Sequence, residues 1–436
     1  MTTPRHAPPH VFLDFVGCRL NQAEIERLAR NFLAAGYRLT ADPAEADLMV
    51  LNTCAVTREA ARKSRQAIRQ AGRANPSASI VATGCYATLS PERLSALPQV
   101  TQVIDNQDKD RLVTLLTGEP PLYEQEPLLR EPARPGMLGR TRAFVKIQDG
   151  CDNRCSFCVT TIARGPGRSR SGDEIITEVN RLTDAGYNEV VLTGVHLGSY
   201  GHDRGEQHGL RRLVEALLAD TSISRLRLSS LEPWDIDPGF FDLWEDARLC
   251  PHLHLPLQSG CQTTLRRMAR RTTPAAFGSL VDAARARIPD LAITTDVIVG
   301  FPGETDDEFE QSYRFIEEMR FARLHVFTYS SRAGTAAAAM TGQIPAEVKR
   351  ARHTQLRALG KAHEHAFRRQ YLGCTLTVLW ESAHGATAEG FNWSGLTGNY
   401  LRITTKSHNH LHNTITPVLT TALTDDGLLA DVLSAA

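Results

Sequence analysis

The chain has 436 residues, of which 42% are hydrophobic and 22% charged, a composition typical of a globular protein with several domains. Its 49 basic and 49 acidic residues cancel, so overall charge gives no argument for a nucleic acid partner. No apolar run approaches the roughly 18 residues needed to cross a bilayer, and the start, MTTPRHAPPH, contains no signal-peptide core. We therefore expect a cytoplasmic protein without a membrane partner, in which the nine cysteines serve metal or redox chemistry rather than disulfides.

The first region, residues 8–118, alternates strand-like and helix-like segments, which predicts an open parallel α/β domain. Three strands are expected in it, at residues 10–16, 46–52 and 78–84. A helix should follow the first strand. Asn21 and Glu24 have the spacing of a capping box at its start, and Gly36 suits its end.

A proline-rich stretch at residues 119–140 predicts a linker. Beyond it, residues 137–369 hold six strand–helix repeats, which favour a barrel or partial barrel with its function at the C-terminal ends of the strands. This region closes with a long basic helix, from about Ala346 to Tyr371. Residues 370–436 contain short alternating runs rich in Thr, Val and Leu, which indicate a small all-β domain of barrel type.

Three cysteines form a tight loop after the first expected barrel strand. Cys151, Cys155 and Cys158 have the spacing C-x-x-x-C-x-x-C, and Gly150 before them allows a sharp backbone turn. Three thiolates this close can hold one 4Fe–4S cluster and leave one iron open to a substrate or cofactor. A structural zinc site is the alternative, but it normally takes four protein ligands in paired C-x-x-C spacing, and no second pair stands nearby.

A second set of cysteines shares a position rather than a spacing. Cys18, Cys54 and Cys85 each follow an expected strand and precede an expected helix. The C-terminal ends of parallel strands meet at one edge of a sheet, and helix N-termini at that edge favour thiolates. We therefore expect these cysteines to converge on a second cluster. The alternative is three buried structural cysteines.

These motifs resemble a known family. The central loop resembles that of radical S-adenosylmethionine (SAM) enzymes, and GCRLNQAE, LNTCAVT and TGCYA resemble the three cysteine motifs of the methylthiotransferases. The resemblance covers nearly the whole chain. It implies an α/β protein with an open N-terminal domain, a partial (β/α)6 radical SAM barrel and a small OB-like barrel called TRAM.

The resemblance also implies the cofactors and the reaction. Two 4Fe–4S clusters are held by the six cysteines, and two equivalents of SAM are used. One SAM molecule yields the radical that removes hydrogen from the target, and the other methylates the sulfur that replaces it. A reducing electron donor of flavodoxin or ferredoxin type and a sulfur source are the implied partners, and we expect a monomer.

The substrate branch follows from similarity alone. NTCAVTREAARKSRQ, SSLEPWD and HLHLPLQSG are most similar to the branch that converts N6-threonylcarbamoyladenosine at position 37 of tRNA, 3′ of the anticodon, to its 2-methylthio derivative. Arg19 stands where the branch that acts on a ribosomal-protein aspartate usually has proline. That branch and the isopentenyladenosine branch are the alternatives within the family, and a non-catalytic iron–sulfur RNA-binding protein is the alternative of another class.

Further site residues are expected on loops at the barrel strand ends. The candidates for SAM contacts are Gly194, Glu232, Gln258 and Asp296. The candidates for RNA contacts are Arg62, Lys63, Arg65, Arg168, Trp393 and Tyr400. The four cations follow cysteine motifs and could bind phosphates, while the two aromatic residues could stack on bases. For each of these residues an ordinary surface or turn position is the alternative.

Overall fold

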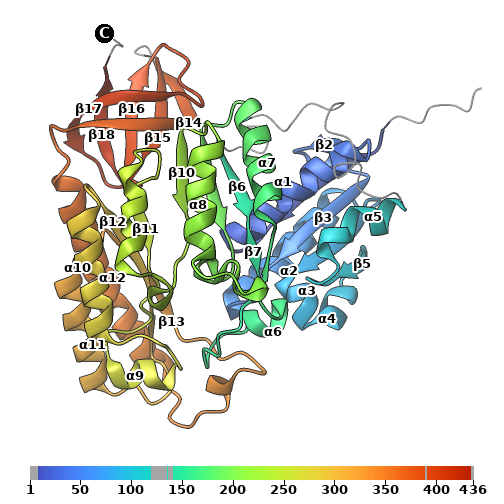
Figure 1. Cartoon of the computed structure of the whole chain (residues 1–436). Helices are drawn as coiled ribbons and strands as arrows, with labels where there is room; N and C mark the ends of the chain where they lie inside the picture. The colour runs from blue at the N-terminus through green and yellow to red at the C-terminus, as the bar shows by residue number, and fades with distance from the viewer. Residues whose placement is uncertain (1–7, 119–134, 136–140, 388–389, 434–436) are drawn as a thin grey trace, which may run out of the picture.

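The computed structural model describes residues 8–118, 135, 141–387 and 390–433 (Figure 1). It contains a parallel α/β domain, a central partial barrel and a closed C-terminal β-barrel, which confirms the predicted α/β fold class. The stretch predicted as a linker lies outside the described residues except for Pro135. Within the described part of the chain, no helix is both long enough and apolar enough to cross a membrane.

The N-terminal sheet has five strands in the order β2-β1-β3-β4-β5, and every neighbouring pair is parallel. Its elements are β1 (His10–Phe15), α1 (Arg19–Ala34), β2 (Arg38–Thr40), β3 (Leu48–Thr53), α2 (Arg58–Ala74), β4 (Ser79–Gly84), α3 (Cys85–Leu89), α4 (Pro91–Ser95), β5 (Val100–Ile104) and α5 (Leu112–Thr117). The three predicted strands correspond to β1, β3 and β4, which are consecutive in the sheet. The loops that carry Cys18, Cys54 and Cys85 therefore leave the sheet side by side.

The predicted capping box is wrong. Helix α1 begins at Arg19, ahead of Asn21, and no side chain caps its N-terminus. The amide of Asn21 instead donates to the carbonyl of Val16 at 2.8 Å, and the buried carboxylate of Glu24 pairs with Lys109 at 2.6 Å. Both side chains point into the boundary with the next domain, so their capping-box spacing is coincidental.

The central domain is built from two three-stranded parallel sheets, which the bridge between Ser230 and His254 joins into one curved sheet. The resulting order is β6-β9-β10-β11-β12-β13, the predicted six-stranded partial barrel. Its elements are β6 (Arg142–Lys146), β7 (Gln148–Asp149), α6 (Thr160–Arg164), β8 (Arg168–Ser169), α7 (Gly172–Asp184), β9 (Glu189–Thr193), α8 (Gly209–Asp220), β10 (Arg225–Leu228), β11 (His252–His254), α9 (Gln262–Arg267), α10 (Pro274–Arg287), β12 (Ala292–Val299), α11 (Asp306–Met319), β13 (Arg323–Thr328) and α12 (Ala346–Arg369).

The open side of this barrel is covered by the N-terminal domain. Helix α1 lies along the edge strand β6 (Figure 1), where Glu26 accepts a hydrogen bond from the backbone N–H of Phe144 at 3.1 Å. Farther along the helix, Arg30 pairs with Glu178 of α7 at 2.5 Å. Ala23 is buried against Phe144. The partial barrel thus gains a wall that its own strands do not supply.

The C-terminal barrel is closed, with the strand order β14-β15-β16-β18-β17. Its strands are β14 (Thr375–Thr387), β15 (Gly390–Thr397), β16 (Arg402–Ser407), β17 (Ile415–Leu423) and β18 (Leu428–Val432). It docks on β10 of the central barrel through two arginines. Arg227, 0% exposed, pairs with Glu189 at 2.7 Å and donates to the carbonyl of Gly398 at 2.7 Å. Arg225 donates to the carbonyl of Leu396 at 3.1 Å.

We expect Arg227→Ala to loosen this docking, because it leaves the buried carboxylate of Glu189 without its nearest partner. Breaking a buried ion pair costs about 3–5 kcal/mol, and the unfolding transition that includes the C-terminal barrel should lose about that much in a urea titration. Arg287→Ala removes an exposed pair with Asp242 and is the matched control, with an expected change below about 1 kcal/mol. Equal losses of unfolding free energy in the two variants would show that burial of the Arg227–Glu189 pair does not stabilise the docking.

Candidate metal centre

The three central cysteines lie together at the C-terminal end of the barrel. All three are half-buried free thiols. The backbone N–H of Asn153 points at the Cys151 sulfur at 3.4 Å, and that of Thr160 points at the Cys158 sulfur, also at 3.4 Å. Such donors stabilise anionic sulfur, the form that binds metal.

Gly150 fixes the entry to this loop. Its φ is +72°, and a Cβ atom at this position would stand 1.8 Å from the carbonyl oxygen of Pro166. The N–H of Cys151 is bonded to the carbonyl of Gly165 at 3.0 Å. Only glycine allows the two backbone segments to approach this closely.

Arg270 lies against the middle cysteine. Its guanidinium is 3.7 Å from the Cys155 sulfur and pairs with both oxygens of Glu232, at 3.0 and 2.5 Å. Burial raises the pKa of Cys155 to about 11, and the charge of Arg270 opposes that effect. Glu232 is the predicted SAM contact after β10, and its carboxylate is engaged by this arginine.

His196 lies against the first cysteine and was not predicted as a site residue. Its Nδ1 is 3.3 Å from the amide nitrogen of Asn153, and its Nε2 bonds to the carboxylate of Asp235. Burial lowers the pKa of His196, but hydrogen bonds to Asp235 and Cys151 outweigh burial and raise it to about 10. The only sequence signal was the position of His196 in the glycine-rich loop after β9.

The other three candidates for SAM contacts lie at the barrel strands as expected. A Cβ on Gly194 would stand 3.1 Å from the carbonyl oxygen of Gln148, so this glycine also serves close packing within the protein. Gln258 has φ +71° and donates its backbone N–H to the carbonyl of Asp296 at 2.8 Å. The Asp296 carboxylate is 3.4 Å from Nε2 of His254. Contact with SAM stays a prediction for all four candidates.

The structure also brings Cys18, Cys54 and Cys85 into one neighbourhood. The loop after β1 touches the loop after β3, since a Cβ on Gly17 would stand 2.7 Å from Cβ of Cys54. Burial raises the pKa of Cys54 to about 11, and the other two thiols raise it further. Asn106 supplies an amide N–H donor to the Cys85 sulfur at 3.7 Å.

Arg164 connects the two sets of cysteines. This buried residue of α6 donates to Glu24 at 2.8 Å and to Asp149 at 2.8 Å, just before the central loop. It also donates at 2.9 Å to Asn21, whose Oδ1 lies 3.9 Å from the Cys18 sulfur. The charge of Arg164 lowers the pKa of Cys54, against the larger effect of burial. Nothing in the sequence distinguishes this arginine from surface arginines.

The donor chemistry fits iron–sulfur clusters at both places. The described residues contain no group of three or more His, Cys, Asp or Glu side chains arranged around a single metal ion. A cubane cluster requires a different arrangement, because each thiolate binds its own iron atom. Three thiols lie at each place. Backbone N–H groups and the Arg270 guanidinium are directed at sulfur atoms of the central loop, and the Asn106 amide is directed at the Cys85 sulfur of the second set.

The predicted phosphate contacts lie on the surface. Arg62 pairs with Glu59 at 2.6 Å, Lys63 is exposed, and Arg65 donates to the hydroxyl of Tyr86 at 2.7 Å. Arg168 is exposed near the central loop. A surface hollow along α2 is lined by Arg62, Arg65, Gln66, Arg69, Gln70 and Arg73.

The predicted base-stacking residues occupy structural positions instead. Trp393 is 4% exposed within the core of the C-terminal barrel, so its ring is not available to a base. The Tyr400 ring has the guanidinium carbon of Arg227 at 3.9 Å from its centroid and the edge-on ring of His252 at 4.5 Å. Its hydroxyl accepts from Arg142 at 2.8 Å. Tyr400 therefore faces the central barrel rather than solvent.

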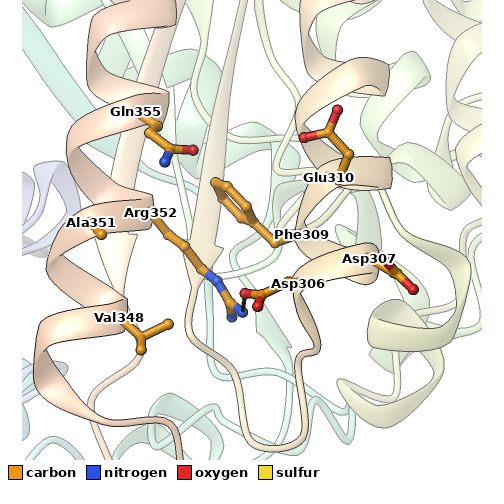
Figure 2. Close-up of a pocket in the computed structure, with 8 residues that line it drawn as sticks. All are labelled: Asp306, Asp307, Phe309, Glu310, Val348, Ala351, Arg352 and Gln355. Atoms are coloured by element: carbon orange, nitrogen blue, oxygen red, sulfur yellow. Dashed lines mark hydrogen bonds and ion pairs between the residues drawn. The ribbon is translucent and has the colours of Figure 1, made fainter.

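A groove between α11 and α12 lies apart from these groups. Figure 2 shows Arg352 of α12 directed at Asp306, to which it donates at 2.7 Å, beside the ring of Phe309. The groove is lined by Asp306, Asp307, Phe309, Glu310, Val348, Ala351, Arg352 and Gln355. None of the predicted site residues lines it, and we assign it no part in the metal centre.

Comparisons with known proteins support the assignment of a radical SAM site to the central loop. The family model described as the radical SAM superfamily matches residues 145–316, and that described as uncharacterized protein family UPF0004 matches residues 10–105. The solved structure of the radical S-adenosylmethionine methyltransferase TsrM from Kitasatospora setae has a TM-score of 0.55 at 16% identity, and the match covers 76% of this chain and 77% of that one. At this identity the likeness concerns the fold alone. Fold, cysteine loop and family model together define a radical SAM protein, a class that binds a 4Fe–4S cluster and SAM.

Relatives of similar length identify the family within the radical SAM class to which the chain belongs. Threonylcarbamoyladenosine tRNA methylthiotransferase MtaB of Bacillus subtilis (strain 168) is 38% identical over 408 residues, covering 90% of this chain and 89% of the relative. The protein of the same name from Thermotoga maritima is 36% identical, covering 85% and 86%. A tRNA-2-methylthio-N(6)-dimethylallyladenosine synthase of Clavibacter michiganensis is 36% identical, covering 86% and 73%. The chain belongs to the tRNA methylthiotransferase family.

We expect Gly150→Ala to abolish binding of the cluster at the central loop, because the added Cβ collides with a backbone carbonyl. Iron per chain after anaerobic reconstitution, and SAM cleavage without RNA, measure the loss. Gly36→Ala is the matched control, since Gly36 also has a positive φ, +88°, but nothing within 4 Å of the added Cβ. It should cost only about 1–2 kcal/mol of stability for the left-handed conformation and keep full iron content. Normal iron in Gly150→Ala would contradict the assigned constraint.

Proposed function

We propose that this chain is a cytoplasmic tRNA methylthiotransferase that converts N6-threonylcarbamoyladenosine at position 37 to its 2-methylthio derivative. The observation that carries the proposal is the second set of cysteines, which Arg164 links to the radical SAM loop. A second set of thiols next to a radical site supports sulfur insertion rather than simple hydrogen abstraction. The relatives that bear the threonylcarbamoyladenosine name support the substrate branch.

Each set of cysteines has its own task in this proposal. Cys151, Cys155 and Cys158 hold the cluster that binds SAM, and the set after β1, β3 and β4 holds an auxiliary cluster. When bound, the clusters and SAM supply the one-electron and methyl-transfer chemistry that an unactivated C–H bond requires. The protein supplies orientation: Arg270 and His196 hold the central loop, and Arg164 sets the two cysteine sets relative to each other.

The RNA contacts belong mainly to the N-terminal and central domains in this proposal. The arginine-lined hollow of α2 starts close to Cys54 and offers cations to the RNA backbone. Arg168 offers a further cation to the RNA backbone near the central loop. A reducing protein of flavodoxin or ferredoxin type and a sulfur donor complete the set of partners, and the enzyme acts as a monomer.

The substrate assignment is tested by nucleoside mass spectrometry. Reconstituted enzyme, SAM and a reductant are incubated with anticodon stem-loop RNA that carries N6-threonylcarbamoyladenosine, and the 2-methylthio nucleoside is the expected product. Matched RNA with isopentenyladenosine should give little product. Product from the isopentenyl RNA alone would move the enzyme to the other tRNA branch. No SAM cleavage with any substrate would favour the non-catalytic iron–sulfur RNA-binding protein.

The auxiliary cluster is tested by counting iron. Two 4Fe–4S clusters require about eight irons per chain after anaerobic reconstitution, and Cys54→Ala should retain about four. This variant should still cleave SAM but form no methylthio nucleoside, because the auxiliary site is lost and the central loop is intact. Cys374→Ala changes a half-buried cysteine of the C-terminal region and should behave as wild type. Equal iron in wild type and Cys54→Ala would refute the second cluster.

A further inference from the structure

The guanidinium of Arg19 has no anionic partner among the described residues. Arg19 is the first residue of α1, and although solvent reaches its side chain, the surrounding protein is dense enough that burial lowers the pKa of its guanidinium. It makes no hydrogen bond or ion pair with any described residue, and its one directed contact is with the ring of Tyr400, 5.2 Å from guanidinium carbon to ring centroid. Arginines within a protein normally meet a carboxylate, a carbonyl or an anionic ligand.

Glu189, the carboxylate whose charge raises the pKa of Arg19 against the larger effect of burial, is already paired with another arginine. Arg142 and Arg227 also surround the Tyr400 ring, at 5.4 and 3.9 Å from its centroid. Arg227 pairs with Glu189 at 2.7 Å, and Arg142 pairs with Glu381 at 2.8 Å. Two of the three guanidinium groups around the Tyr400 ring are therefore paired with a carboxylate. The third, that of Arg19, has no such ion pair among the described residues. An anionic group of a ligand could therefore pair with the Arg19 guanidinium.

The position of Arg19 connects this charge to the metal centre. The residue directly follows Cys18, a predicted ligand of the auxiliary cluster. On its other side lies the barrel, because the Tyr400 ring that Arg19 contacts also packs edge-on against the ring of His252 on β11, with 4.5 Å between the ring centroids. Arg19 thus stands between the second cysteine set and the space enclosed by the barrel strands.

The substrate in the proposed function carries a matching anion. The threonyl part of N6-threonylcarbamoyladenosine ends in a carboxylate, whereas an isopentenyl group is uncharged and apolar. On the adenine ring, C2 and C6, which bears N6, flank N1 on the same edge. A base held with C2 toward the second cysteine set must therefore place its N6 substituent near that set as well.

We propose that Arg19 binds the carboxylate of the threonylcarbamoyl group and so selects this substrate over uncharged N6-modified adenosines. The inference rests on the proposed function and adds a specificity residue to it. The planar guanidinium can donate two parallel hydrogen bonds to a carboxylate, and the Tyr400 ring beside it restricts its orientation.

The test compares stem-loop RNAs that differ only at the modified base. One carries N6-threonylcarbamoyladenosine, one its methyl ester, and one unmodified adenosine, and binding to reconstituted enzyme is measured by fluorescence anisotropy. Loss of a charge-assisted hydrogen bond pair should weaken binding of the acid to Arg19→Gln about 10- to 100-fold. The ester should be bound equally by both proteins. Arg19→Lys should recover part of the loss.

Controls separate this role from a general defect. Arg314→Gln removes an exposed arginine that pairs with Glu310 on the outer helix α11, and it should bind all three RNAs as wild type does. Iron content and SAM cleavage without RNA should be unchanged in Arg19→Gln, which would show that the Cys18 loop is intact.

Three outcomes would overturn the inference. Wild type could bind acid and ester equally, Arg19→Gln could keep the wild-type preference for the acid, or Arg19→Gln could weaken all three RNAs by the same factor. The last result would identify a phosphate contact. Failure of the proposed function differs from all of these, because wild type would then form no methylthio nucleoside while the binding comparison would still decide the role of Arg19.

Discussion

The arrangement of the metal centre depends on a buried ion-pair network centred on Glu24 and Arg164. Glu24 pairs with Arg164 at 2.8 Å and with Lys109 at 2.6 Å, and all three side chains are buried. The network holds the pKa of Glu24 well below its usual range, because the nearby cations outweigh the effect of burial. Since Arg164 also pairs with Asp149, the same charges fix the N-terminal sheet against the start of the central cysteine loop. Buried charges of this kind are costly unless their geometry is complete, so the network favours one relative placement of the two domains.

The interior of the barrel is enclosed by all three domains. Six strands alone leave one side open, and α1 lies along that side through Glu26 and Arg30. At the opposite end from the cysteine loop, Tyr400 of the C-terminal barrel enters between Arg142 and Arg227. The C-terminal barrel therefore helps to enclose the central barrel, since the Tyr400 ring packs between arginines of β6 and β10.

The sequence predicted the parts of the molecule that have a local signature. Strand–helix alternation, the three-cysteine loop and the placement of Cys18, Cys54 and Cys85 after consecutive strands depend on neighbours in the chain, and the fold agrees with them. Residues whose role depends on distant partners were missed or misread. Asn21 and Glu24 had a capping spacing but serve the domain boundary, and Trp393 was predicted to stack on a base but is part of a core. Arg164 has no local signature, because its partners lie in two other segments, α1 and β7.

The raised pKa values of the cysteine thiols couple metal binding to the charged side chains placed around them. Burial raises the pKa of Cys54 and of Cys155 to about 11, so both are protonated thiols at neutral pH in the metal-free chain. Iron binds thiolates, so loading each site must release protons and place negative charge in surroundings that disfavour it. The charges of Arg164 and Arg270 act against burial by lowering the pKa of Cys54 and of Cys155, respectively, and so reduce that cost. Each arginine is itself held by a carboxylate, Glu24 or Glu232, so the cations are in position before any metal arrives. The Glu24–Arg164 pair that sets the domain arrangement therefore also prepares the second cysteine set for anionic sulfur, and the Glu232–Arg270 pair does the same for the central loop.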